Sequence, residues 1–397
     1  MKWVSIFKYL SIEYGENIAF AMDQTQRVSF ESNVDAERLR IRFTNRYGKN
    51  DLKIDHATIG KEKLHYITDL TEITFGGKRK VTIAPGQELF CDDIEYELWA
   101  GDRLVVSLYF GDRQDIDSIC CFWADRGARV NWLLGDATNG TDADRAPLAV
   151  TAPYIKDDPN FHMMKIFTGF DAVQGFVDDE TKVVAAFGDS ITHMSFYTNA
   201  LQKRLYEEAF GRTTFINSGI GGNRLLSDAT TVQEIGKQLV FFGEAGVKRF
   251  ERDVFELDEI DAILVLIGIN DIMHPVQLEG RNGSTPAADI IDGYKQIIAC
   301  AHENGAEVFF GTITPCGNED YPKEWLPEFE RVRCEVNRWI RKGELIDGYF
   351  DFDKELADPD NPEFMQDGCH IGDGLHPNSN GGGKMADCVD IKTVIGN

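Results

Sequence analysis

The pattern of apolar residues changes at about Thr181, and this change constrains the fold more than any other feature of the sequence. Before it, short segments such as 39–43 and 104–110 alternate polar with apolar side chains, and turn residues separate them. That pattern is typical of antiparallel strands in a sandwich. After it, the apolar runs are nearly continuous, which indicates strands buried on both faces of a parallel sheet. The sequence therefore predicts a β-sandwich-like domain over 1–180 and a second domain over 181–397.

The second domain alternates strands with helices. Nearly continuous apolar runs occupy residues 183–187, 214–216, 262–267 and 308–313. Apolar residues at helical spacing predict helices over 195–210 and 286–304, the second with Thr285 as its N-cap. Such alternation predicts an α/β, doubly wound parallel sheet, in which ligands bind at the carboxyl ends of the strands. The residues that directly follow each apolar run are therefore the first candidates for a site.

The charge of the chain excludes several classes of partner. Its 397 residues include 41 Lys+Arg and 66 Asp+Glu, which gives a net charge of −25. An acidic surface disfavours nucleic acid and anionic lipid, because both carry negative charge. No apolar run approaches the roughly 20 residues that cross a bilayer. We therefore expect neither nucleic acid nor a membrane as a partner.

The expected compartment follows from the cysteines and the N-terminus. The eight cysteines show no C-x-x-C spacing, which indicates reduced thiols rather than a disulfide framework. The first residues begin like a signal peptide, but Lys8 and Glu13 interrupt the apolar stretch and no small-residue cleavage site follows. We expect a cytoplasmic protein, with secretion as the alternative.

The first apolar run of the second domain ends in Gly188, Asp189 and Ser190. A serine on a tight turn between a strand and a helix is exposed at the rim of the sheet, where its amide lies at the positive end of the helix. The alternative is that Asp189 or Ser190 only caps this helix. The G-x-S-x-G pattern is not matched, because Thr192 takes the place of the second glycine.

Two further strand ends carry weaker signals. The second run is followed by Gly219, Gly221 and Gly222, which let a backbone approach a substrate closely or simply form a turn. The third run is followed by Asn270. Its side-chain amide can donate to a developing oxyanion, or it can form an Asx turn that ends the strand.

Near the C-terminus, Asp and His occur three residues apart twice, as Asp367 with His370 and as Asp373 with His376. A hydrolytic serine needs an imidazole to take its proton, and the imidazole needs an acceptor that fixes its tautomer. Either pair satisfies this requirement by spacing alone. Four residues are also possible metal ligands, namely Cys369, His370, Asp373 and His376, but no fixed zinc signature is present.

Taken in order, these clusters resemble the four blocks of the SGNH (GDSL-like) hydrolase superfamily, which contribute Ser, Gly, Asn and His in turn. The resemblance spans about residues 183–378. It implies that Ser190 is the nucleophile and that the oxyanion hole consists of the amides of Ser190 and Gly222 with the side chain of Asn270. It also favours Asp373 and His376 as the acid and base of the triad. The fold that it implies is a flavodoxin-like parallel sheet.

The sequence departs from the family pattern at two positions. Ile191 stands where many members have Leu, which is a conservative change. Gly382 stands where related sequences often carry an aromatic residue, which affects the expected packing of the last helices.

Residues 27–110 also resemble the β-rich N-terminal domain of a subgroup of these enzymes, many of which are taken to be carbohydrate esterases. The resemblance therefore implies a serine esterase that hydrolyses small acyl esters, such as acetyl groups on a xylo-oligosaccharide or another sugar, without a metal or organic cofactor. One alternative is a lipase, lysophospholipase or thioesterase that uses the same residues. The non-enzymatic alternative is a carbohydrate-binding protein with an inert hydrolase fold.

Several other residues are ambiguous. His193 and His274 follow the first and third blocks, and they are either pocket residues or solvated or capping histidines. Three tryptophans are either sugar-stacking or core residues, namely Trp123, Trp132 and Trp325.

Overall fold

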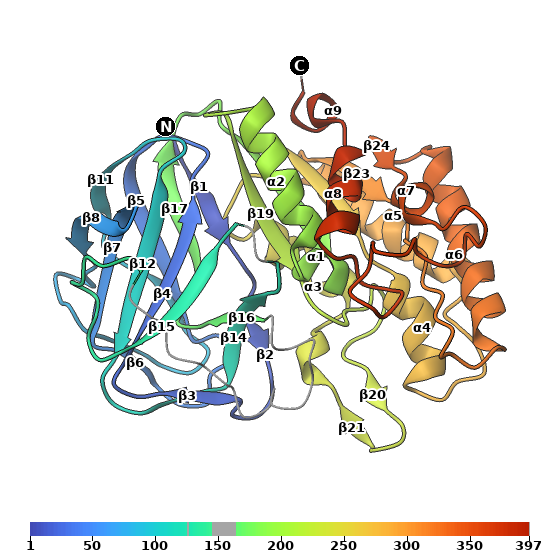
Figure 1. Ribbon diagram of the computed structural model, residues 1–397, viewed down its shortest axis with the longest axis horizontal. Coiled ribbons are helices and arrows are strands. Elements are labelled where there is room, and N and C mark those ends of the chain that lie inside the picture. Colours follow the sequence, from blue (N-terminus) through green and yellow to red (C-terminus); the bar gives the residue numbers. More distant parts are fainter. Residues whose placement is uncertain (125–126, 145–163, 397) are drawn as a thin grey trace. The chain divides into compact units, whose positions relative to one another are not determined.

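The computed structural model describes residues 1–124, 127–144 and 164–396. The chain forms two compact units, one of Met1–Thr181 with Ala209–Ile216 and one of Lys182–Glu208 with Asn217–Asn397. Figure 1 shows that the first unit consists largely of strands and that the second combines strands with helices.

The first unit contains two five-stranded sheets in which all paired strands are antiparallel. One sheet consists of β1 (Lys2–Lys8), β17 (Phe170–Val177), β5 (Ala36–Thr44), β10 (Glu88–Phe90) and β11 (Ile94–Leu98). The other consists of β15 (Arg129–Leu134), β4 (Gln24–Glu31), β12 (Arg103–Phe110), β7 (His56–Lys63) and β8 (Tyr66–Glu72). A three-stranded sheet consists of β16 (Lys165–Phe167), β14 (Ser118–Phe122) and β2 (Ile12–Glu13). Two strand pairs consist of β3 (Ala19–Ala21) with β13 (Gln114–Ile116) and of β6 (Leu52–Ile54) with β9 (Val81–Ile83).

Aromatic side chains join the two large sheets of the first unit. Phe7 on β1 stacks on Phe30 of β4, with 4.3 Å between the ring centroids. Phe167 and Phe170 lie against the same Phe7 ring and are buried. Burying these rings stabilises the unit by the hydrophobic effect, at roughly 25 cal/mol per Å² of apolar surface. The predicted antiparallel, β-rich N-terminal region is confirmed.

The chain after residue 181 forms a five-stranded sheet in the order β19-β18-β22-β23-β24, although residues 213–216 of β19 are grouped with the first unit. Its strands are β18 (Lys182–Gly188), β19 (Thr213–Gly219), β22 (Ala262–Leu266), β23 (Glu307–Gly311) and β24 (Gly348–Phe350). The pairs β18–β22, β22–β23 and β23–β24 are parallel. In order along the chain the strands are arranged 2-1-3-4-5, which is the flavodoxin-like order. The predicted parallel sheet is confirmed, and its continuous apolar runs are buried.

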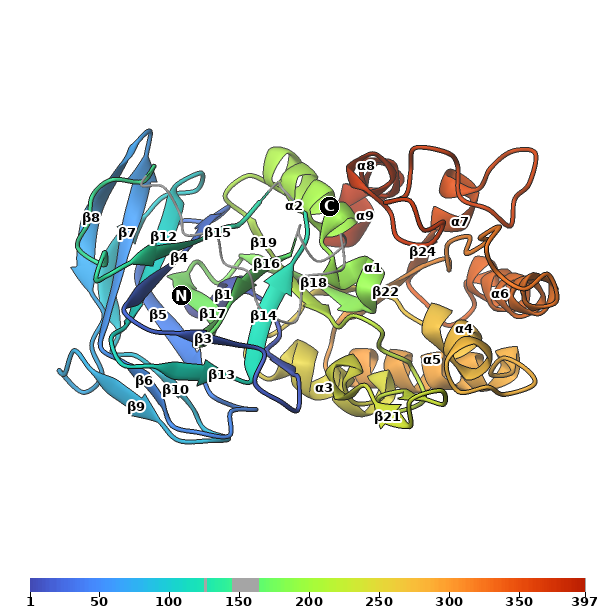
Figure 2. The ribbon, with the colours of Figure 1, turned by 60° about the horizontal axis from the view of Figure 1, so that its bottom comes forward.

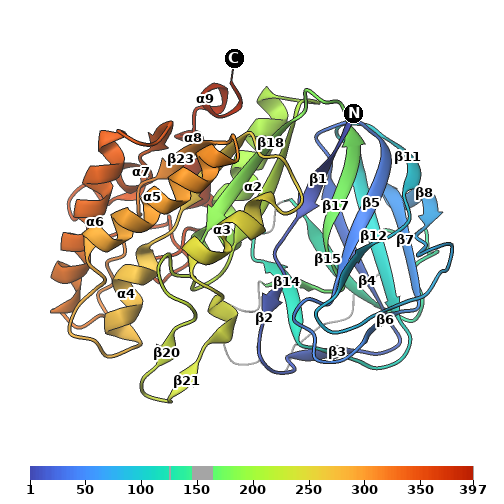
Figure 3. The same ribbon diagram turned by 180° about the vertical axis from the view of Figure 1, so that it is seen from behind.

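Helices cover both faces of this sheet. They are α1 (Ser190–His193), α2 (Phe196–Glu208), α3 (Gly246–Phe255), α4 (Ile269–Gln277), α5 (Ala287–Glu303), α6 (Trp325–Lys342), α7 (Phe352–Leu356), α8 (Ser379–Asp387) and α9 (Ile391–Ile395). Figure 2 shows α2 and α8 on one face and α3 and α5 on the other, and Figure 3 shows the second face from in front. A hairpin of β20 (Thr231–Val232) and β21 (Lys237–Gln238) and the short helix η3 (Val240–Phe242) follow β19.

The helix ends agree with the sequence in part. α6 ends at Gly343, which adopts a left-handed conformation with φ of 66° and caps the helix without the steric cost of a Cβ. The predicted cap at Thr285 is wrong, because Pro286 occupies the N-cap of α5 and no side chain caps this end. Gly382 lets α8 pack closely on α2, since a Cβ there would lie 2.5 Å from the carbonyl carbon of Phe196. An aromatic residue at 382 would therefore not fit.

Candidate active site

Ser190 lies at the carboxyl end of β18, on the first turn of α1. Asp189 is the N-cap of α1, and its Oδ1 accepts a hydrogen bond of 3.0 Å from the amide of Ile191. The capping role therefore belongs to Asp189 and leaves the Ser190 hydroxyl available for other contacts. Ser190 is partly exposed, whereas Asp189 is buried.

The Ser190 hydroxyl points to His376, and His376 in turn points to Asp373. Ser190 Oγ lies 2.8 Å from His376 Nε2, and His376 Nδ1 lies 2.5 Å from Asp373 Oδ2. The second oxygen of Asp373 accepts from the amides of Leu375 and His376, at 3.0 and 2.9 Å. The loop before α8 thus holds the carboxylate by three hydrogen bonds, with the imidazole between it and the serine.

The carboxyl of Asp373 is held in its ionised form. Burial acts to raise its pKa, but hydrogen bonds from the imidazole and two amides, together with the charge of His376, lower the pKa to about 2. A carboxylate that stays charged at neutral pH can accept from Nδ1–H and fix the tautomer in which Nε2 is the base.

The other Asp and His pair, Asp367 and His370, does not form a hydrogen bond with Ser190. His370 Nδ1 accepts hydrogen bonds of 3.1 Å from the amides of Gly372 and Gly374. It therefore shapes the loop that precedes His376, while Asp367 is exposed. Among the described residues, no group of three or more His, Cys, Asp or Glu side chains is arranged as a metal site.

Gly222 and Asn270 occupy the ends of the two neighbouring strands. Gly222 has a positive φ of 71°, and a Cβ there would lie 2.1 Å from the ring of Phe242, so only glycine fits. Asn270 lies in the first turn of α4, where its Nδ2 donates to the carbonyl of Asn223 at 2.9 Å. It does not form the Asx turn that was the alternative. Within the described part of the chain, neither the Ser190 amide nor the Gly222 amide has a recorded acceptor.

Comparison with known proteins assigns this region to a family. Residues 186–382 match the model of the GDSL-like Lipase/Acylhydrolase family. The second unit belongs to this family. The chain is accordingly a carboxylic ester hydrolase, and its substrate is a small-molecule ester.

Several solved structures are similar to about half of this chain. The acetyl xylan esterase AlAXEase is 21% identical, with 52% of this chain and 96% of that chain covered and a TM-score of 0.39. Est24, a carbohydrate acetylesterase from Sinorhizobium meliloti, is 14% identical, with 52% and 95% covered and a TM-score of 0.36. A GDSL-like lipase from Bacteroides thetaiotaomicron is 15% identical, with 54% and 87% covered and a TM-score of 0.37. No curated protein sequence matches the chain.

Two buried carboxyls lie next to the candidate catalytic residues of the acylhydrolase. Burial raises the pKa of Asp189 to about 7, although the amide of Ile191 and the charge of His376 act in the opposite direction. Burial likewise raises the pKa of Asp271 to about 6. Asp271 accepts from the amides of Leu225 and Leu226, at 2.6 and 3.0 Å, and so ties the loop after Gly222 to α4.

The two ambiguous histidines have structural partners, and neither is solvated. His193 Nδ1 accepts from the amide of Gly221 at 2.9 Å, one residue before Gly222. His274 Nδ1 lies 2.9 Å from Thr230 Oγ1, and its ring stacks on Phe242 at 5.2 Å. Burial lowers the pKa of His274 to about 3, so its imidazole is neutral at physiological pH.

The tryptophans pack against protein in different ways. Trp132 is buried on β15, where its Nε1 donates to the carbonyl of Ile166 at 3.0 Å, which makes it a core residue. Trp325 lies against Tyr321 and Phe329, with ring centroids 6.1 and 6.3 Å away, and it is half-buried. Trp123 is half-buried.

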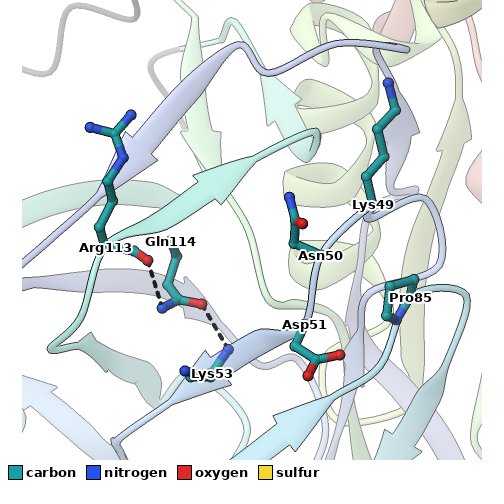
Figure 4. A pocket seen from close by; sticks show the side chains of 7 residues that line it. All are labelled: Lys49, Asn50, Asp51, Lys53, Pro85, Arg113 and Gln114. Atoms are coloured by element: carbon teal, nitrogen blue, oxygen red, sulfur yellow. Dashed lines mark hydrogen bonds between the residues drawn. The ribbon is translucent and has the colours of Figure 1, made fainter.

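A hollow of about 460 Å³ lies in the first unit. Figure 4 shows its lining, which consists of Lys49, Asn50, Asp51, Lys53, Pro85, Arg113 and Gln114. Arg113 is paired with Asp115 at 3.0 Å, and the Lys49 ammonium donates to the carbonyl of Gly15. Its described lining holds neither a nucleophilic hydroxyl or thiol nor an imidazole, so this hollow lacks the groups for acyl transfer.

We also compared the helices with the length and hydrophobicity that a membrane span requires. No helix in the described ranges is long and apolar enough to span a bilayer.

Sequence reasoning missed three residues around the site. Asn223 directly follows Gly222, and Asp271 directly follows Asn270. Their places at the strand ends could therefore have marked them as candidate site residues. Arg249 lies on α3 without any motif, and a charged residue on a helix is ordinarily expected at the surface.

Proposed function

We propose that Ser190, His376 and Asp373 form the catalytic triad of a serine esterase that removes short acyl groups, such as acetate, from a carbohydrate. The observation that carries the proposal is the continuous contact from Ser190 Oγ to His376 Nε2 at 2.8 Å and from His376 Nδ1 to Asp373 Oδ2 at 2.5 Å. A nucleophile, a base and the group that orients the base are thus within hydrogen-bond reach.

In the first half of the reaction, Ser190 Oγ attacks the ester carbonyl while His376 Nε2 takes the hydroxyl proton. Asp373 stabilises the resulting imidazolium. The negative charge on the tetrahedral intermediate is met by the amides of Ser190 and Gly222 and by Asn270 Nδ2. Collapse of the intermediate breaks the ester C–O bond, and the imidazolium gives its proton to the departing sugar hydroxyl.

In the second half, His376 takes a proton from water, and the water oxygen attacks the acyl-Ser190 ester. The tetrahedral intermediate forms in the same oxyanion hole and collapses to the carboxylic acid, while Ser190 Oγ recovers its proton from His376. No step requires a metal ion or an organic cofactor.

Two features support a short acyl chain on a neutral sugar. The Phe242 ring packs against Gly222 and restricts the space beside the oxyanion hole. The net charge of −25 disfavours anionic lipid substrates.

We further propose that residues 1–180 are an accessory domain and 181–397 the catalytic domain, and the chemistry requires only the second. The first is then free to contribute to substrate choice.

A chain-length series tests this function. We expect p-nitrophenyl acetate to be hydrolysed with a higher kcat/KM than the butyrate, octanoate and decanoate esters, and acetate to be released from acetylated xylo-oligosaccharides. Ser190→Ala serves as the matched control, since it removes only the nucleophile. A preference for decanoate would contradict the short-chain proposal and favour a lipase, and a folded protein without activity on any ester would favour an inert hydrolase fold.

A further inference from the structure

Arg249 is a fully buried cation in the middle of α3. Its guanidinium lies over the ring of Phe187 on β18, 4.2 Å from the ring centroid. Taking a charge out of water is costly unless the protein supplies acceptors for its N–H groups. The identity of these acceptors therefore indicates what Arg249 does.

The acceptors of Arg249 belong to the segments that carry the proposed oxyanion donors. One terminal nitrogen donates to the carbonyl of Gly188 at 2.8 Å, two residues before Ser190. The other donates to the carbonyl of Ser218 at 3.0 Å, near the end of β19. Nε donates to Asn223 Oδ1 at 2.9 Å, and Asn223 directly follows Gly222. One side chain thus joins the ends of two neighbouring strands and the loop after the second.

Asn223 extends this connection to the third strand end. Its backbone carbonyl accepts from Asn270 Nδ2 at 2.9 Å. Its own Nδ2 donates to the carbonyls of Phe242 and Glu244, each at 2.7 Å. Asn223 is completely buried, and its side-chain oxygen is the atom that Arg249 holds. Asn223 therefore connects Arg249 to Asn270 by one hydrogen bond on each side.

The negative charge of Asp253 does not by itself explain why a cation is buried at position 249. Arg249 does donate to Asp253 Oδ2 at 3.1 Å, one helical turn away. However, Arg252 donates to the other oxygen of Asp253 at 2.8 Å, so this carboxylate already has a cationic partner. The remaining hydrogen bonds of Arg249 all go to the segments that hold Ser190 and Gly222, and Asn223 of the second segment contacts Asn270.

We propose that Arg249 is a positioning residue that sets the three oxyanion donors in place before substrate binds. This inference rests on the proposed esterase function. Donors that are fixed in advance stabilise the transition state without reorganising, whereas a displacement of about 1 Å can cost about 100-fold in rate. Loss of Arg249 should therefore lower kcat and leave KM nearly unchanged.

Arg249→Lys tests the proposal, because lysine keeps the positive charge beside Asp253 but cannot reach acceptors on three segments from one nitrogen. With p-nitrophenyl acetate we expect kcat to fall by about 10- to 100-fold and KM to change by less than about threefold. A folded Arg249→Lys protein with unchanged kcat would overturn the proposal. A loss confined to KM would overturn it as well, since that result describes weaker substrate binding.

Arg333→Lys is the matched control within the same unit. Arg333 is also buried, pairs with Glu330 and Asp353, and donates to the carbonyl of Ile313, and none of these partners belongs to the segments that Arg249 joins. Its substitution should lower thermal stability and leave kcat unchanged. Equal losses of kcat in both variants would mean that any buried arginine of this unit has the same effect, and this would overturn the specific role of Arg249.

Asn223→Ala provides a second route if Arg249→Lys does not fold. It removes the Oδ1 acceptor and leaves Arg249 its other partners, so the same fall of kcat with little change of KM is expected. A folded Asn223→Ala protein with unchanged kcat would overturn the connection from Arg249 to Asn270.

A variant that combines two substitutions tests whether Arg249 acts through Asn270 or lowers activity independently of it. If Arg249 acts partly through Asn270, the two losses overlap, and Arg249→Lys with Asn270→Ala should keep at least about threefold more activity than the product of the single effects. Losses that simply multiply would contradict the coupling.

Activity of the unsubstituted protein distinguishes the two proposals. If it hydrolyses p-nitrophenyl acetate while Arg249→Lys keeps its kcat, only the positioning role fails. If the unsubstituted protein hydrolyses no ester, the proposed function fails and the positioning role fails with it.

Discussion

Each unit contains a buried arginine whose guanidinium donates to backbone carbonyls. In the first unit, Arg27 donates to the carbonyls of Ala137, Gly140 and Asp142, at 2.6, 2.6 and 2.7 Å. These acceptors belong to one short segment after β15, so Arg27 shapes one connection of the sandwich. In the second unit, the acceptors of Arg249 belong to separate segments that carry the candidate catalytic residues.

The same contrast holds for one acidic side chain in each unit. Asp171 in the first unit accepts two hydrogen bonds from Arg42, at 3.0 and 2.7 Å, and both side chains are buried. Arg42 also lies 3.9 Å from Glu88 Oε2, so these charges belong to a set of ion pairs that joins neighbouring strands. Asp373 in the second unit instead leads through His376 to the partly exposed hydroxyl of Ser190. A polar network that contains only structural ion pairs, here called closed, indicates structure. A polar network that ends at a reactive group, here called open, indicates function.

The largest expected effect is the loss of kcat when His376, the proposed general base of the second unit, is replaced. Replacing His376 by Ala removes the group that accepts the Ser190 proton, and kcat should fall by about 10⁴-fold or more. His376 is part-exposed, so thermal stability should change little. Steady-state hydrolysis of p-nitrophenyl acetate and a thermal melt measure the two quantities. Retention of more than a few per cent of the activity would show that His376 is not the base.

The matching change in the first unit should have the reverse pattern. Arg42→Met leaves Asp171 as a buried charge without its bidentate partner, and we expect a loss of about 3–5 kcal/mol in the free energy of unfolding of this unit. At a temperature where the variant stays folded, kcat/KM should equal that of the unsubstituted protein. A specific loss of kcat in the folded variant would break the distinction between a closed and an open network.

Asn270→Ala should have a smaller kinetic effect than loss of the base. Removing one oxyanion donor typically lowers kcat on the order of 10²–10³. The lost hydrogen bond to Asn223 should lower the free energy of unfolding by only about 1 kcal/mol. Steady-state kinetics compared with urea unfolding distinguish these contributions. A kcat within about threefold of normal would assign Asn270 to loop structure alone.

The smallest effect concerns pH and Asp189, whose pKa burial raises to about 7. Between about pH 4 and 7 the native state holds a proton that the unfolded chain has released, so stability falls as pH rises through this range. Asp189→Asn keeps an acceptor for the Ile191 amide and never ionises. Its stability relative to the unsubstituted protein should therefore rise with pH, by at most about 1.4 kcal/mol per pH unit.

Urea unfolding at a series of pH values measures this difference. The two proteins should differ least at about pH 4, where Asp189 is protonated in both states. A difference that stays constant from pH 4 to 7 would contradict the assignment of the shift to Asp189.

The sequence predicted those parts of the fold that depend on local periodicity. Alternating segments gave the antiparallel sheets of the first unit, and continuous apolar runs gave β18, β19, β22 and β23. The candidate site residues were found because parallel strands bring their carboxyl ends to one edge of a sheet, and the order of the motifs resembled a known family. Periodicity and strand polarity are properties that a single sequence contains.

The sequence did not predict features that depend on tertiary packing. The burial of Arg249 is determined by carbonyls that belong to segments up to 61 residues away. The close approach of α8 to the backbone of Phe196, which requires Gly382, depends on two helices that are distant in the sequence. The expected Thr285 cap is wrong because capping is decided by the local backbone path, and there Pro286 takes the N-cap position.

The central claim is that Ser190 is an activated nucleophile. Labelling with a fluorophosphonate probe, followed by peptide mapping in a mass spectrometer, tests it most directly, because such probes form a covalent bond with an activated serine. We predict a single adduct at Ser190 that is absent in Ser190→Ala and strongly reduced in His376→Ala. An adduct at another residue, or no adduct in a protein that hydrolyses esters, would contradict the account.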